Sequence, residues 1–263
     1  MKAIKTVGVL FTLICYSLFL LQSFAATDNP STATKPVIVI IIDDVGHNLR
    51  KGRELIDLNG QITLSILPFS PHGKTIAHLA HNQGKEVILH SPMAPLNHTS
   101  PPDGLTLDMD KARFVRLLNQ QINDIPNVSG INNHMGSALT RNVIAMSWVM
   151  QELKKRDLYF IDSRTTAESI AWHTALHYRV PSWKRDVFLD NQRDVSAINK
   201  QLNKLVKKAK EKGIAFGIGH PYDETITALK GFLNSQAAHN IEIRSPSQLD
   251  SWIKVKYASN NLE

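Results

Sequence analysis

The stretch VIVIIIDDVG, which runs from Val37 to Gly46, decides the fold of this chain. Six β-branched apolar residues lead directly into two adjacent acids, Asp43 and Asp44, and then into a glycine. An uninterrupted apolar run is typical of a strand buried on both faces, as in a parallel sheet. Two neighbouring carboxylates repel each other and need pairing or desolvation. The pair therefore either caps the following helix or lies beside something cationic.

The same succession of apolar run, polar turn and helical segment recurs along the chain. The expected strands are 37–42, 62–67, 86–89, 128–131, 158–161, 186–189, 214–218 and 241–243. The expected helices are 49–58, 72–83, 109–123, 141–156, 165–177, 194–212 and 222–238. Strands that alternate with helices pair in parallel through right-handed crossovers. The sequence therefore predicts an α/β fold.

Seven or eight such units either close into a barrel or spread as an open doubly wound sheet. No G-x-G-x-x-G motif follows the first strand, so a dinucleotide site has no support. We favour a (β/α) barrel of seven strands with imperfect closure.

Acids and histidines follow most of these strands. The carboxyl ends of parallel barrel strands meet on one face, which is where such barrels hold their active sites. The residues at these ends are Asp43, Asp44, His90, His134 (preceded by Asn133), Asp162, Asp190 and His220. The sequence therefore predicts one shared site at that face.

Carboxylate and neutral imidazole are ligands for zinc and similar divalent ions. The candidate ligands are one aspartate of the pair together with His90, His134 and His220. A bound cation neutralises that aspartate, while the other stays off the metal and accepts a proton from water. Because consecutive strand residues point to opposite sides, we expect the two aspartates to have different roles.

Other hydrolase chemistries have less support. A serine triad needs an elbow such as G-x-S-x-G, which is absent from the chain. A paired-carboxylate glycosidase that uses Asp43, Asp162 or Asp190 stays open, since this chemistry also occurs in barrels. It leaves the strand-end histidines without a role. His47, close to the acid pair, is a further residue that can reach the site.

The first 25 residues have the layout of a secretory signal. Lys2 and Lys5 precede an uncharged apolar run from Val7 to Leu21, and residues 23–25 place small side chains at the cleavage positions. This run of about 15 residues is shorter than the roughly 20 that a membrane span requires. We therefore expect cleavage after Ala25 rather than an uncleaved anchor.

Residues 26–36 are polar and rich in threonine and proline, so they predict a flexible tether ahead of a domain over 37–255. The single cysteine, Cys15, lies in the signal, which leaves the mature protein without disulfides or a cysteine nucleophile. We expect a periplasmic or secreted protein with no membrane span after cleavage.

The formal net charge is +7, and the basic residues are spread along the chain. The lysine-rich segment 204–213 has helical spacing and is typical of a solvated outer face. We therefore expect no nucleic-acid partner.

Six blocks of the sequence resemble, in the same order, those of the divergent polysaccharide deacetylase family, a distant branch of the NodB-type carbohydrate esterases. The blocks are IIDDVG, EVILHSPM, GINNHMGS, FIDSRT, RDVFLDN and GIGHP, and the resemblance covers about 37–250. It implies a distorted (β/α)7 barrel with parallel strands and outer helices. It also implies removal of acetyl groups from polysaccharide with a divalent metal, often zinc.

The resemblance further implies roles for individual residues. Asp43 matches the general base, Asp44 a metal ligand, and His220 the general acid that protonates the leaving group. Ordinary members carry a second metal histidine four residues after the first, where this chain has Ala94. We expect His134 to replace it and to bind the metal with Asp44 and His90. Supporting or substrate-contacting roles are expected for Asn133, Asp162 and Asp190.

Two functional hypotheses follow. The first is an exported metal-dependent deacetylase that acts on envelope polysaccharide, such as a peptidoglycan- or chitin-like glycan. The second is a weakly active or inactive barrel that binds glycan or an envelope protein partner.

Overall fold

The computed structural model describes residues 35–97, 99–235 and 239–249, which belong to the compact unit that begins at Lys35. The predicted signal peptide and residues 26–34 of the predicted tether lie outside the described residues. In the described part of the chain, no helix has the length and apolar character to cross a membrane.

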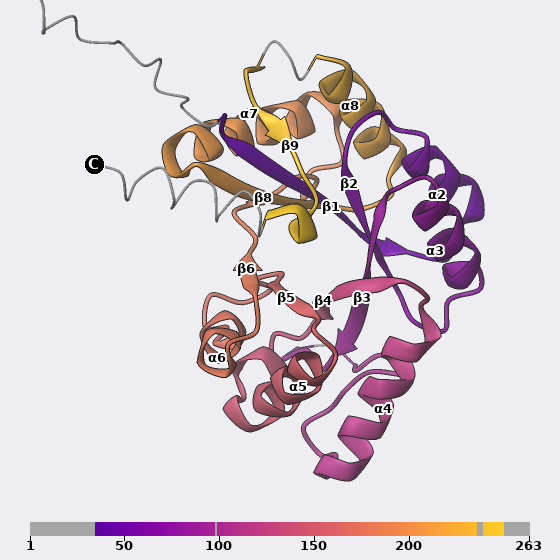
Figure 1. The fold of residues 1–263 in the computed structure, drawn as a ribbon, viewed down its shortest axis with the longest axis vertical. Helices are drawn as coiled ribbons and strands as arrows, with labels where there is room; N and C mark the ends of the chain where they lie inside the picture. The colour runs from indigo at the N-terminus through magenta and orange to yellow at the C-terminus, as the bar shows by residue number, and fades with distance from the viewer. Residues whose placement is uncertain (1–34, 98, 236–238, 250–263) are drawn as a thin grey trace, which may run out of the picture. The chain divides into compact units, whose positions relative to one another are not determined.

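One parallel sheet forms the centre of this unit. Its strands are β1 (Val37–Val45), β2 (Ile62–Ile66), β3 (Glu86–Met93), β4 (Val128–Met135), β5 (Tyr159–Asp162), β6 (Ser182–Lys184), β7 (Val187–Phe188), β8 (Ile214–Gly219) and β9 (Glu242–Ile243). They pair in the order β6-β5-β4-β3-β2-β1-β8-β7, and β9 pairs with β1. β6 and β7 end this order and do not pair with each other, so the sheet is not closed; it curls into an open barrel (Figure 1). The predicted distorted barrel is confirmed.

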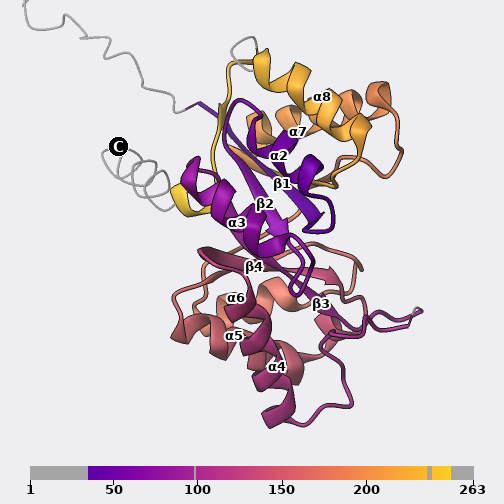
Figure 2. The ribbon, with the colours of Figure 1, turned by 90° about the vertical axis from the view of Figure 1, so that its right-hand side faces the viewer.

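The helices lie on the outer side of the curled sheet (Figure 1). They are α2 (Leu49–Ile56), α3 (Gly73–Asn82), α4 (Lys111–Asp124), α5 (Val143–Lys155), α6 (Ala171–Tyr178), α7 (Val195–Lys212) and α8 (Asp223–Asn234), with short 3-10 turns η1 (Leu139–Arg141) and η3 (Pro246–Gln248). Figure 2 shows α4, α5 and α6 on one half of the unit, and α7 and α8 together on the other.

The strand β1 is buried on both faces, as the apolar run predicts. Ile38, Ile40 and Ile42 are fully buried in the core between the sheet and the helices. Val37, Val39 and Ile41 alternate with them and are fully buried in a second cluster inside the curled sheet, among Tyr159, Ile161, Phe216, Ile218 and Leu249. This double burial places β1 at the centre of the barrel.

Helix ends follow local rules. Asn48, Asp110, Asn142 and Asp194 each cap the start of a helix by accepting a backbone N–H. Gly213 ends α7 with a φ of 87°, as is typical of a glycine C-cap. Since Asn48 caps α2, the Asp43–Asp44 pair is not a helix cap.

Several element boundaries differ from the sequence prediction, and β1 runs to Val45 rather than to residue 42. The strands β3 and β4 extend four residues beyond 89 and 131, so His90 and His134 lie within strands rather than after them. The helix expected from residue 165 begins at Ala171, because the carboxylate of Asp162 holds the intervening loop by accepting from Arg164 N and Ser169 Oγ. The short strand β6 was not predicted; its three residues are too few for an apolar pattern.

Candidate active site

Asp43 and Asp44 both line one pocket, although they are consecutive residues of β1. The pairing of β1 with β2 shifts register between Ile42 and Val45, and Asp44 has a φ of +56°. A bulge re-aims the side chains that follow it, and aspartate tolerates the left-handed region better than most residues. The expectation that the two side chains point to opposite sides is therefore wrong, because strict alternation ends at the bulge.

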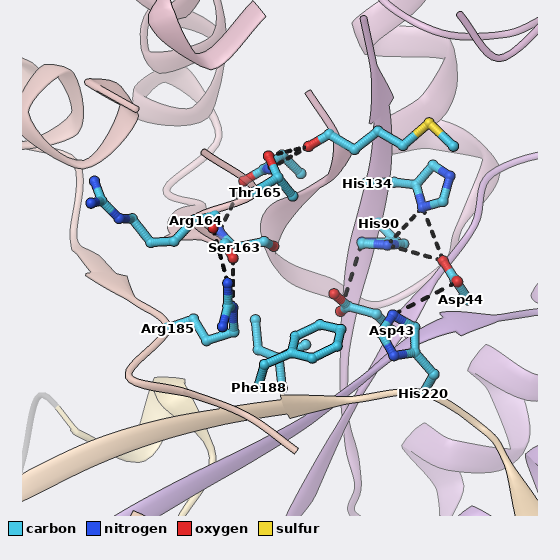
Figure 3. Close-up of a pocket in the computed structure, with 13 residues that line it drawn as sticks. Asp43, Asp44, His90, His134, Ser163, Arg164, Thr165, Arg185, Phe188 and His220 are labelled. Carbon is cyan, nitrogen blue, oxygen red and sulfur yellow. Dashed lines mark hydrogen bonds and ion pairs between the residues drawn. The ribbon is translucent and has the colours of Figure 1, made fainter. Parts of the chain in front are cut away.

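Asp44, His90 and His134 come together from β1, β3 and β4 (Figure 3). Asp44 Oδ1 lies 2.9 Å from His134 Nδ1 and 3.2 Å from His90 Nε2. The two ring nitrogens are 3.1 Å apart. The structure thus clusters the three residues that the sequence selects as metal ligands.

This cluster fits a divalent metal ion. Asp44 Oδ1 is buried and has no partner with hydrogen-bond alignment among the described residues, which is costly unless another group satisfies it. Ligand atoms of a tetrahedral zinc ion with bonds of about 2.0–2.1 Å lie roughly 3.3 Å apart. The observed separations of 2.9, 3.1 and 3.2 Å are close to that value.

The charged groups of the cluster shift the pKa values of Asp44 and His90. Burial would raise the pKa of Asp44, but His134 and His90 beside it outweigh burial and hold this pKa well below its usual range. Burial would lower the pKa of His90, but the charges of Asp43 and Asp44 raise it to about 9. Without a metal, a protonated imidazole therefore supplies the positive charge that the carboxylates require.

Asn132 orients both His90 and Asp43, and the sequence interpretation missed it. Its Oδ1 lies 2.7 Å from His90 Nδ1 and also accepts from Ser65 Oγ, while its Nδ2 donates to Asp43 Oδ1 at 2.7 Å. When His90 Nδ1–H donates to this oxygen, the lone pair of a neutral His90 is on Nε2, the atom beside Asp44. The signal was the two-residue spacing from Asn132 to His134, which puts both on one face of β4.

His220 faces the cluster from the end of β8. Its Nδ1 lies 2.9 Å from Asp190 Oδ1, and its Nε2 lies 3.9 Å from Asp44 Oδ2. Asp190 Oδ2 also accepts from the backbone N–H of His220 and from Thr225 Oγ1. Burial would lower the pKa of His220, but the hydrogen bond to Asp190 and the nearby negative charges raise it.

The remaining predicted residues shape the pocket wall. Asn133 lines the pocket; its Oδ1 accepts from Ser163 N and its Nδ2 donates to Met135 O. Asp162 is fully buried and holds the loop after β5, so among the residues that line this pocket its neighbours Ser163 and Arg164 appear instead. Asp162 therefore acts on the pocket through that loop.

The pocket has a volume of about 430 Å³. Ser163, Arg185 and Phe188 line it and were missed from sequence, because they lie in or next to strands of only two to four residues. His47, left open from sequence, lines a neighbouring cavity of about 240 Å³ that shares Asp44 and His220 with the first.

Ala94 lies in the hydrophobic core and not among the candidate metal ligands. It follows β3 directly, is 7% exposed and packs in the core between sheet and helices. Its N–H donates to Leu105 O, and its carbonyl accepts from Ala138 N and Leu139 N. The continuation of β3 through Pro92 replaces the helix that would carry a second histidine on the same face as His90.

Comparisons with known proteins identify relatives of this chain. Residues 40–249 match the sequence profile of a family described as divergent polysaccharide deacetylase. The Escherichia coli protein YibQ is 37% identical over 207 residues, which cover 78% of this chain and 64% of YibQ. The chain thus spans less than two thirds of that relative's length.

Solved structures share the fold. Protein ATU2773 from Agrobacterium tumefaciens matches with a TM-score of 0.79 at 25% identity, over 83% of this chain and 91% of that protein. The peptidoglycan deacetylase PdaC from Bacillus subtilis matches with a TM-score of 0.55 at 14% identity, over 86% of this chain and 96% of PdaC. The curled parallel sheet with outer helices is therefore the fold of NodB-like deacetylases.

Proposed function

The chain belongs to the divergent polysaccharide deacetylase family, and from this premise we propose that it is an exported, metal-dependent deacetylase of envelope polysaccharide. The observation that carries the proposal is the convergence of Asp44, His90 and His134, with both ring nitrogens within 3.2 Å of one buried carboxylate oxygen. Export rests on the predicted signal peptide over residues 1–25. The glycan class rests on the family and on the fold shared with a peptidoglycan deacetylase.

Asp44, His90 and His134 would hold the ion, and a set of one carboxylate and two imidazoles suits zinc. A bound zinc ion polarises the acyl carbonyl and lowers the pKa of a water molecule beside it. Asn132 fixes the tautomer of His90 that such a role needs.

Asp43 is the proposed general base. Its Oδ1 accepts from Asn132 Nδ2, and its Oδ2 has no hydrogen-bond partner among the described residues. Asp43 lines the pocket next to Asp44, so this free oxygen is placed to accept the proton of the attacking water.

His220 is the proposed general acid. Its Nδ1 is engaged by Asp190, which leaves Nε2 as the proton-carrying atom toward the pocket. Its raised pKa favours the protonated imidazole, which is the form that can donate to the leaving amine or alkoxide. In each turnover Asp43 therefore gains one proton, from the attacking water, and His220 loses one, to the leaving group.

A non-catalytic binder of glycan or of an envelope protein is the second candidate. The observation that favours it is Ala94 in place of a ligand histidine, which leaves Asp44, His90 and His134 as a remodelled set of candidate ligands. A metal-free glycosidase is the third candidate, although Asp162 does not line the pocket.

Metal analysis combined with acetate release tests the proposal. We expect about one zinc per chain and acetate release from chitin oligosaccharides or peptidoglycan strands, abolished by a chelator and restored by zinc. Stoichiometric metal without acetate from any of these glycans favours the binder. Cleavage of the glycan chain that survives chelation favours the glycosidase.

A further inference from the structure

Charge is unevenly distributed around the pocket. Asp44, His90 and His134 lie on one side, and Ser163, Arg164 and Arg185 lie on the other (Figure 3). In the proposed reaction the acyl group occupies the side of the metal ligands. The opposite side is then available for another part of the substrate.

Arg185 is held rigidly on this opposite side. Its Nε donates to Ser163 O at 2.7 Å and its Nη2 to Arg164 O at 2.9 Å. The guanidinium carbon lies 5.0 Å from the centre of the Phe188 ring. The remaining nitrogen, Nη1, has no hydrogen-bond partner among the described residues, so a fixed cationic donor is left unused in the pocket wall.

Ser163 offers a second unused donor next to Arg185. The residue is 5% exposed, and its Oγ is buried without a hydrogen-bond partner among the described residues. Its backbone is fixed at both groups, since the N–H donates to Asn133 Oδ1 and the carbonyl accepts from Arg185. A buried unpaired hydroxyl beside a pocket requires a partner, such as a water molecule or a group of a bound ligand.

The geometry points to an anion subsite formed by Ser163, Arg185 and Phe188, which selects glycans whose acetylated sugars carry a carboxylate. A carboxylate has two oxygens and accepts from both a guanidinium and a hydroxyl. Phe188 supplies an apolar surface beside the anion for the carbon skeleton of the sugar. Arg164 adds positive charge to the same side, although its own nitrogens donate to Ser169 O and Ala167 O.

This inference rests on the proposed function and deepens it. A neutral chitin-like chain leaves both donors unpaired on binding, which costs affinity. An acidic chain, such as a peptidoglycan strand with free lactyl carboxylates, pairs both. The subsite therefore favours the acidic class of glycan over the neutral one.

Calorimetric titration of the full, zinc-loaded protein carrying Asp43→Asn tests the subsite without turnover. The probes are peptide-free peptidoglycan strands, the same strands with their carboxylates converted to methyl amides, and chitotetraose. We expect the acidic strands to bind at least tenfold more tightly than either neutral probe, because hydrogen bonds to charged groups are the stronger ones.

Ser163→Ala is the decisive variant, because the hydroxyl it removes has no described partner in the fold. It should weaken binding of the acidic strands about tenfold and of the neutral probes less than twofold. Ser182→Ala is the matched control: this hydroxyl is also buried and unpaired, but Ser182 does not line the pocket. Arg185→Gln should weaken binding of the acidic strands by more than Ser163→Ala does.

Equal affinity for acidic and amidated strands, or an equal loss for both in Ser163→Ala, overturns the subsite. If acetate is still released by the wild type, the proposed function stands while the subsite falls. If the protein prefers acidic strands in a Ser163-dependent way but releases no acetate, the subsite is supported and the proposed deacetylase function is overturned. Absence of binding to every probe overturns the subsite.

Discussion

His134 Nδ1 lies 2.9 Å from Asp44 Oδ1, although two strands separate β4 from β1 in the sheet. The curl of the sheet and the bulge at Asp44 bring the two atoms together. The same curl brings His90 Nε2, on β3, within 3.2 Å of both atoms. The cluster is therefore a product of the barrel, and each of its members can be tested separately.

Asp44→Ala and Asp43→Asn should separate metal binding from proton transfer. Asp44→Ala removes the central oxygen of the cluster, so we expect loss of bound metal and of activity. Asp43→Asn leaves the three ligand atoms in place but removes the base, so we expect retained metal and a loss of kcat of about 10²–10⁴-fold. Metal content and acetate release measure the two effects.

Asp103→Asn, at an exposed carboxylate outside the pocket, serves as the control for these variants. Full activity of Asp43→Asn would show that Asp43 is not the general base, and full activity of Asp44→Ala would show that Asp44 is not a required metal ligand.

Asn132→Leu should weaken zinc binding about 10- to 100-fold, the usual effect of losing a group that orients a ligand. The substitution removes the contact to His90 Nδ1 and the donor to Asp43. Ser65→Ala is the matched control, since it deletes only the other hydrogen bond to the same amide oxygen, the one from Ser65 Oγ. Competition titration with a chromogenic chelator gives both affinities, and equal effects of the two variants would contradict the orienting role.

His134→Ala should abolish tight metal binding, and adding Ala94→His should not restore it. Ala94 packs in the core outside the curled sheet, and both its backbone groups are engaged. A histidine there overpacks the core, which costs about 1–3 kcal/mol, and does not reach the pocket. Zinc titration and thermal unfolding of the double variant check both statements; recovered zinc affinity would show that the family's usual ligand position is still accessible.

The arrangement of strands was largely predictable because each strand carries its own signal. The double burial of β1 follows from six β-branched residues in a row, and parallel pairing then places the strand ends on one face. His90, His134 and His220 could be found in this way without any knowledge of distances.

The errors arose where local geometry departs from regular pattern. The positive φ of Asp44 cancels the alternation that assigned the two acids to opposite sides. Arg185 lies in the two-residue link between β6 and β7, where no periodicity can develop. Asn132 was overlooked because an asparagine inside a strand has many roles, and its bonds to His90 and Asp43 depend on tertiary contacts.

Tyr159 should make stability depend on alkaline pH. Burial, followed by the nearby Glu86, raises the pKa of Tyr159 well above its usual value, and its hydroxyl donates to Glu86 Oε1. A group with a raised pKa in the folded state stabilises the protein below its unfolded pKa, about 10 for tyrosine. This stabilisation is lost as the pH rises above that value.

Tyr159→Phe should therefore cost roughly 1 kcal/mol near pH 8 but lose less additional stability than the wild type between about pH 10 and 11. Urea unfolding across this range measures the effect. Tyr178→Phe is the control, because the pKa of Tyr178 is lowered instead. Parallel stability curves for wild type and Tyr159→Phe would refute the prediction.

Asp190→Asn should move the alkaline limb of the pH profile of kcat/KM to lower pH. Burial lowers the pKa of His220, and the hydrogen bond and charge of Asp190 are the principal effects that raise it. A general acid must be protonated to work, so activity is lost as the pH rises through its pKa. When the charge of Asp190 is removed, that loss begins at lower pH, and activity at pH 8 should fall roughly tenfold or more.

Thr225→Val provides the comparison, because it removes a hydrogen bond to Asp190 Oδ2 but keeps the charge. It should shift the alkaline limb less than Asp190→Asn does, and neither variant should move the acidic limb. An alkaline limb that stays in place in Asp190→Asn would show that His220 is not the group whose proton is lost. A shift of the acidic limb instead would assign that limb to the Asp190–His220 pair.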